Sequence, residues 1–173
     1  MKMPFLICLS LIITNVLAQL PDPEFPPGFI LHARLHNGLL TKMNSSPDRY
    51  AGGLQVVPQV TVIPHRLRAG VSAGLFYADH KVQALAGPSI AWKIKTLHAS
   101  FFGSAGNIHL AADHWWGTRG QAFAGGSFNL DLGNLLVLGL SAHRDYSRGN
   151  WWLQQTLAVR INKKKVEKEP FNE

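Results

Sequence analysis

Hydrophobic residues alternate with small or polar residues through most of this chain, and this period of two constrains the fold more than any other feature. Between Phe29 and Asn162, alternating stretches of about ten residues are separated by turn-forming residues. The 3.6-residue spacing of an amphipathic helix does not occur there. Dividing the chain at its turns predicts eight strands, at residues 29–40, 52–63, 67–78, 82–94, 106–116, 121–132, 135–146 and 151–162.

The composition of the two strand faces distinguishes two kinds of barrel. In the stretch 67–78, aliphatic residues occupy one face, and small or polar residues occupy most of the other. The polar face of a soluble barrel would carry many charges, yet charged residues make up only 16% of the chain and residues 25–162 contain no Glu. In a membrane barrel the aliphatic face contacts lipid and small or polar residues fill the narrow interior. We therefore expect an all-β fold, an eight-stranded antiparallel up-and-down transmembrane β-barrel. A soluble periplasmic ligand-binding β-barrel is the alternative.

Charged residues within the predicted strands fall on the small and polar face. They predict an interior polar network of Arg34, Arg68, Lys93, Asp113, Asp131 and Arg160. Isolated buried charge is costly, so we expect these cations and carboxylates to pair across the lumen.

Aromatic residues gather at alternate strand junctions. If the first strand runs upward, one rim collects Tyr50, Tyr77, Tyr146, Trp115, Trp116, Trp151 and Trp152. Tyr and Trp favour the lipid–water interface because each combines an apolar body with a polar edge. We predict an interfacial aromatic girdle of Tyr50, Tyr77, Trp116, Tyr146 and Trp151.

The two ends of the chain differ from this alternating region. A basic start, a short apolar run and small residues before Gln19 predict a secretory signal peptide at residues 1–18. That run is too short for a membrane-spanning helix. Four prolines in residues 19–28 predict an extended leader, and the charged residues 163–173 predict a solvated periplasmic tail. The barrel is then residues 29–162, and export predicts an outer-membrane location.

Three features do not fit a regular barrel. Pro58 and Pro88 fall within predicted strands, where a proline removes a ladder hydrogen bond, so we expect bulges or local breaks there. The connection 95–105 is long for a periplasmic turn. Gln155 falls in mid-strand on the face that should contact lipid.

In strand count, alternation and rim aromatics, the chain resembles the small eight-stranded outer-membrane β-barrels of Gram-negative bacteria, of the OmpA/OmpX-like and Bacteroidetes outer membrane protein β-barrel type. The segments 67–77 and 135–146 carry the resemblance most clearly, and it covers residues 29–162. It implies a porin-like fold with a structural, adhesive or accessory role in the cell envelope and no catalysis. Members of this family usually end at an aromatic residue that closes the last strand, whereas a charged tail follows that strand here.

The net charge of +7 would suit nucleic-acid binding, but export removes that partner and the basic residues form no single patch. Cations expected at the rim would face the phosphate-rich outer leaflet; they are Arg49, Arg119, Arg144 and Arg148. Outer-membrane lipid and lipopolysaccharide are therefore the expected partners, and an envelope protein is a further candidate. We expect a monomer.

Histidines are the remaining candidates for chemistry. His32 and His36 share a strand face but would lie about 13 Å apart, and no HExxH-like ligand set occurs, so we expect no metal site.

The chain also resembles, in strand count, the outer-membrane lipid A deacylases, which use a Ser–His pair with a supporting acid. His143, Ser147 and Asp145 are the residues that could be interpreted in this way, and a lipid-acting enzyme is thus the second alternative. Alternation directs His143 into the barrel, away from lipid, so we expect no catalytic residues and no cofactor.

Overall fold

The structure, a computed structural model, describes residues 28–43, 48–101, 104–133 and 135–161. For residues 98–101 and 104–105 it describes the backbone alone. The predicted signal peptide and charged tail, and all of the Pro-rich leader except Gly28, lie outside the described residues.

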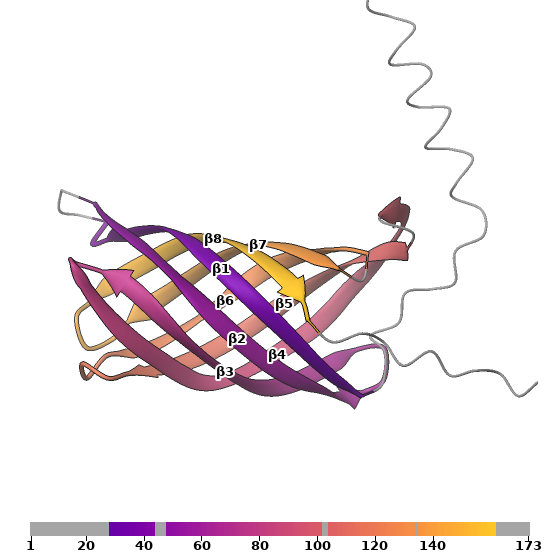
Figure 1. Cartoon of the computed structure of the whole chain (residues 1–173), viewed down its shortest axis with the longest axis horizontal. Helices are drawn as coiled ribbons and strands as arrows, with labels where there is room; N and C mark the ends of the chain where they lie inside the picture. Colours follow the sequence, from indigo (N-terminus) through magenta and orange to yellow (C-terminus); the bar gives the residue numbers. More distant parts are fainter. Residues whose placement is uncertain (1–27, 44–47, 102–103, 134, 162–173) are drawn as a thin grey trace, which may run out of the picture.

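Eight antiparallel strands form one closed up-and-down barrel (Figure 1). The strands are β1 (Phe29–Thr41), β2 (Arg49–Ile63), β3 (Leu67–Ala78), β4 (Lys81–Phe101), β5 (Ser104–Gly117), β6 (Ala122–Leu132), β7 (Leu136–Asp145) and β8 (Asn150–Arg160). Each strand pairs with the next in sequence, and β8 pairs with β1 to close the wall. Closure satisfies the backbone groups of the wall without a free edge, which a lipid environment requires. The predicted fold class is confirmed, and all strand boundaries except the end of β4 lie within three residues of prediction.

The predicted connection 95–105 is wrong. Strand β4 continues to Phe101 and β5 begins at Ser104, so most of that segment is a β-hairpin. Its pairing contains two register shifts, between Lys93 and Lys95 and between Leu97 and Ser100. The pairing of β4 with β3 ends at Trp92, and the hairpin therefore projects past the neighbouring strands (Figure 1).

The two mid-strand prolines break the ladder locally without a bulge. Pro58 pairs with Leu31 of β1 in unbroken register, whereas pairing with β3 skips Val57 and Pro58 and resumes at Gln59 in the same register. Pairing of β4 with β5 likewise omits Pro88 and keeps its register. A missing N–H interrupts one side of the ladder but adds no residue, so the faces of the strand are not exchanged.

One end of the barrel, here called the upper end, carries the short turns at 79–80, 118–121 and 146–149. Asp79 and His80 both have positive φ, of 54° and 58°, which is the two-residue geometry that fits the twist of a hairpin. The interior is too narrow for extra side chains at some positions. A Cβ on Gly125 would collide with the backbone of Ala142 and His143 on β7.

Burial alternates along the strands as the sequence predicts. In β8, buried positions alternate with exposed or half-buried ones from Trp152 to Val159. The outward positions are largely aliphatic, and some of them are among the most exposed residues of the barrel, for example Leu54 at 66% and Leu140 at 65%. An apolar outer surface around a polar interior is the arrangement of a transmembrane barrel.

Candidate functional site

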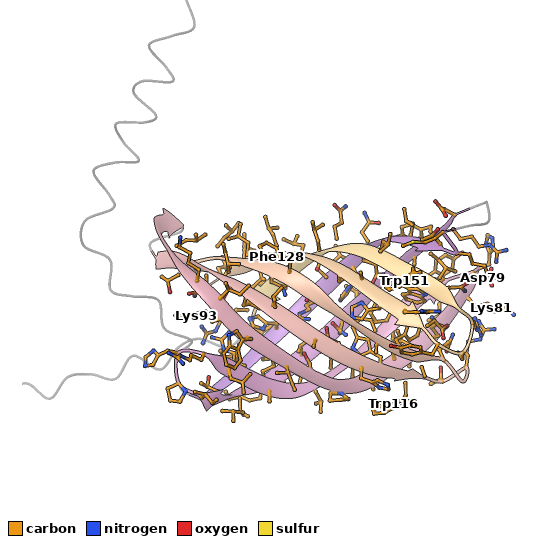
Figure 2. The ribbon with its side chains drawn as sticks, turned by 180° about the vertical axis from the view of Figure 1, so that it is seen from behind. Asp79, Lys81, Lys93, Trp116, Phe128 and Trp151 are labelled. Atoms are coloured by element: carbon orange, nitrogen blue, oxygen red, sulfur yellow. The ribbon has the colours of Figure 1, made fainter. Side chains whose placement is uncertain are left out.

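The centre of the lumen holds buried charges from four strands. Arg34 on β1, Arg68 on β3, Asp113 on β5 and Asp131 on β6 are each at most 7% exposed. The other two predicted network residues, Lys93 and Arg160, are half-buried. Lys93 lies near the end opposite the upper turns (Figure 2).

The two aspartates organise these cations. Arg34 is attracted to both Asp113 and Asp131. Asp131 also attracts Arg68 and Arg160. Asp131 therefore compensates several cations, and Arg34 is attracted to both aspartates.

Each aspartate also contacts a histidine that was not assigned to the network. His109 Nδ1 lies 3.3 Å from Asp131 Oδ1, and His143 Nε2 lies 3.6 Å from Asp113 Oδ2. Both histidines point inward because they occupy the same strand face as the aspartates. The inward direction of His109 and His143 was readable from the alternation, but their pairing with particular aspartates required the register.

Neutral polar groups continue the network along the lumen. His36 Nε2 and Gln55 Oε1 are 3.1 Å apart, and Gln59 Nε2 donates to Ser89 Oγ at 3.3 Å. Nearer the upper end, Gln121 Nε2 donates to Gln83 Oε1. The polar interior is therefore cross-linked between strands at several heights, which stiffens the wall.

The upper part of the lumen is filled by an aromatic plug, which the sequence analysis missed. We give this name to the four buried rings of Phe76, Trp115, Phe123 and Trp152. Phe76 lies 5.8 Å from Trp152 and 5.7 Å from Trp115, and Phe123 lies 4.8 Å from Trp152, measured between ring centroids. The rings come from β3, β5, β6 and β8, so these contacts cross the lumen.

The tryptophans at this rim therefore divide between two environments. Trp115 and Trp152 are 0% and 2% exposed inside the barrel, whereas their neighbours Trp116 and Trp151 lie outside. Adjacent residues of a strand point to opposite faces, so each Trp–Trp pair contributes one ring to each side. His143 stacks on Trp115 at 3.9 Å and connects the plug to the aspartate network.

The predicted girdle residues lie on the outer surface at the upper end. Trp116 is 57% exposed, and Tyr50, Tyr77 and Tyr146 are also exposed, while Trp151 is half-buried. Trp116 and Trp151 appear toward the same end as Asp79 and Lys81 (Figure 2).

Two of the predicted rim cations have partners on this surface. The guanidinium of Arg144 lies 5.9 Å from the Trp151 ring centroid. Arg49 forms an ion pair with Asp79 across the β2–β3 pair, and both side chains are largely exposed.

The residues considered for catalysis are not arranged as a catalytic group. His143 is 1% exposed and faces Asp113, while Ser147 is exposed in the turn after β7 and its hydroxyl donates to Asp145 Oδ1 at 2.6 Å. Asp145 also accepts hydrogen bonds from the backbone N–H groups of Ser147 and Arg148, and its carboxylate therefore stabilises the turn.

Neither a metal-ligand cluster nor a helical membrane span occurs in the described residues. Within these ranges, no group of three or more His, Cys, Asp or Glu side chains is placed to hold a metal ion. None of the described segments forms a helix long and apolar enough to cross a membrane.

Comparison with known proteins supports the fold and does not identify a family. No family model matches the sequence, and no curated protein matches it. Among solved structures, the barrel is similar to one described as "De novo design of transmembrane beta-barrels". The match has a TM-score of 0.51 and 12% sequence identity, and it covers 80% of this chain and 99% of the designed one. At this identity the likeness shows the fold: this chain has the fold of a transmembrane β-barrel.

Proposed function

We propose that this protein is a structural or accessory barrel of a Gram-negative outer membrane, of the OmpA/OmpX-like or Bacteroidetes type, without catalysis. The observation that carries the proposal is the combination of a lipid-compatible outer surface with a lumen that holds buried charges and the aromatic plug. The exposed aliphatic belt needs a hydrocarbon environment, and the aromatic plug leaves the upper lumen no room for a solute.

Short upper turns favour a structural or accessory role over adhesion. The described upper connections at 79–80, 118–121 and 146–149 contain few residues and offer little surface for a large ligand. The exposed rim cations, Arg144 and Arg148 among them, support contact with the phosphates of outer-membrane lipid or lipopolysaccharide.

The two alternatives have less support. A soluble ligand-binding barrel would need a charged outer surface, whereas the outward side chains here are largely aliphatic and Arg34, Arg68, Asp113 and Asp131 are buried. A lipid-acting enzyme would need its histidine on the outer face, and His143 lies beneath the aromatic plug with Trp115 stacked on it.

Membrane fractionation combined with a heat-modifiability gel tests the proposal. We expect the mature full-length protein in the outer-membrane fraction, with a faster-migrating band before boiling than after. Planar-bilayer recordings of the same protein should show no stable conductance steps, because the plug closes the lumen. Recovery in the soluble periplasmic fraction, or steady single-channel currents, would contradict the proposed function.

A further inference from the structure

Two carboxamides lie side by side on the outer surface of this barrel, where the neighbouring outward side chains are aliphatic. Asn37 on β1 and Gln155 on β8 are direct cross-strand partners, and both are exposed. The sequence marked Gln155 as an anomaly, but only the register shows that Asn37 is its neighbour. Among the residues described here, neither side-chain amide has a hydrogen-bond partner.

The pair lies below the aromatic girdle, within the depth that hydrocarbon occupies. Gln155 follows Trp151 by four residues on the same strand, which corresponds to about 13 Å along the strand and about 10 Å of depth at the usual tilt of a barrel strand. The apolar band of such barrels is about 25 Å tall. An amide at this depth has no water to bind, so an unpaired one is costly and a partner for it is favourable.

The surface around the two amides is shaped for close packing. One hollow is lined by Leu39, Gly126, Ala142 and Leu153 together with both amides, and a second by Leu35, Phe128, Leu138 and Leu157 together with both amides. Leu140 borders both hollows and is 65% exposed, so it protrudes between them. Phe128, which lines the second hollow, is labelled in Figure 2. Small residues at a membrane interface allow backbones to approach closely.

We propose that this face, the β8–β1 face, is the contact surface of a homodimer, in which the Asn37–Gln155 pair of one barrel hydrogen-bonds to the same pair of a second copy. A carboxamide both donates and accepts, so the pair is complementary to itself. All copies of a membrane barrel share one orientation, which leaves a twofold axis along the membrane normal as the symmetry of a dimer. Asn37 and Gln155 are cross-strand neighbours and differ in depth by only a few ångströms, about one side-chain length. That axis therefore places Asn37 of each copy opposite Gln155 of the other. Because Leu140, Gln155, Asn37 and Gly52 form one cross-strand row, it also places each Leu140 opposite Gly52 on β2 of the other copy.

The monomer expected from sequence alone is the competing outcome. The dimer requires a bilayer but not an outer-membrane role, so the fractionation experiment and the experiments below fail independently.

Disulfide cross-linking of the full-length protein in native membranes tests the contact face. The two variants are Leu35→Cys and Ile90→Cys. Leu35 lies on β1, two residues before Asn37 on the same outward face, and Ile90 lies on β4, on the opposite wall of the barrel. Both parent side chains are 49% exposed, which makes them a matched pair. We expect Leu35→Cys to give a covalent species of twice the monomer mass after mild oxidation and Ile90→Cys to give none. Equal cross-linking of the two variants, or an adduct of another mass, would overturn the homodimer.

Loss of the amides tests the chemistry of the contact. In Asn37→Leu/Gln155→Leu, we expect the dissociation constant measured by sedimentation in density-matched detergent to rise roughly tenfold or more, because several hydrogen bonds within the membrane are lost. The control is His114→Leu, which removes an outward polar side chain from β5 on the far wall and should leave association unchanged. Heat modifiability should persist in both variants, which shows that they fold. A double variant that associates as tightly as the parent, or a parent that stays monomeric at every protein-to-detergent ratio, would refute the proposal.

Discussion

Removal of the Asp131 carboxylate should destabilise the barrel more than removal of an exposed carboxylate. Asp131 is 7% exposed, lies 3.3 Å from His109 and is the carboxylate that compensates Arg68 and Arg160 and shares Arg34 with Asp113. In Asp131→Ala, Arg68 and Arg160 lose the carboxylate that compensates them, and Arg34 keeps only Asp113. Breaking a buried ion pair from one side costs about 3–5 kcal/mol, and a value near 3 is expected here because Arg160 is half-buried and retains some water.

The assay is equilibrium unfolding in urea, with the barrel in lipid vesicles and folding followed by the faster gel band of the unboiled protein. A loss of about 3 kcal/mol corresponds to roughly a hundredfold change in the unfolding equilibrium. The matched control is Asp79→Ala, which breaks the exposed ion pair to Arg49 and should cost less than about 1 kcal/mol. If Asp131→Ala costs no more than Asp79→Ala, then Asp131 is not the internal counter-ion of this barrel.

Three further changes test other parts of the structure. Leu54→Arg, at a side chain that is 66% exposed, should cost about 2–4 kcal/mol in vesicle unfolding because it places a cation in hydrocarbon, whereas the same change would be nearly neutral on a water-facing surface. Trp115→Ala should cost about 3–5 kcal/mol in the same assay, since it removes a fully buried ring of the aromatic plug, and it should raise ion leakage through vesicles that carry the protein. Gly125→Val should prevent formation of the heat-modifiable band, because its side chain would collide with the backbone of Ala142 and His143; normal refolding would show that β6 and β7 are further apart than described.

Most of the fold could be predicted because the alternation repeats in every strand. In β3, for example, Leu75 is 60% exposed and the next residue, Phe76, is 0% exposed. Each such change between neighbours indicates which face of the strand points outward. The near-absence of charge from one face then indicated that the outer surface of the barrel contacts lipid and not water. The end of β4 was placed too early because Lys93 and Lys95 interrupt the apolar pattern, and the two register shifts there conceal a hairpin that continues past them.

The aromatic plug was missed because a tryptophan near the rim can lie either at the lipid–water interface or inside the lumen. Position along the strand placed Trp115, Trp116, Trp151 and Trp152 at one height. The preference of Trp for the interface then assigned Trp116 and Trp151 to the girdle, while Trp115 and Trp152 were given no role inside the lumen. The direction of each ring follows from the same alternation that defined the strands, and it sends one member of each pair inside. An aromatic girdle and an aromatic plug at the same end of a barrel therefore give the same cluster of aromatic residues in the sequence. Whether a residue is at an inward or an outward position of its strand shows which of the two it belongs to.

The pairing of residues across strands is the information that a single sequence does not carry. His143 with Asp113, and Asn37 with Gln155, are each separated by 30 or more positions, and only the register brings them together. The first pair is buried and completes a charge network whose members were already identified. The second pair lies in an apolar surface where neither amide would be expected alone, and two adjacent amides at one depth make a directional contact that a lipid tail cannot satisfy. For this reason the outward amides, and not the larger set of buried charges, indicate how the barrel interacts with other molecules in the membrane.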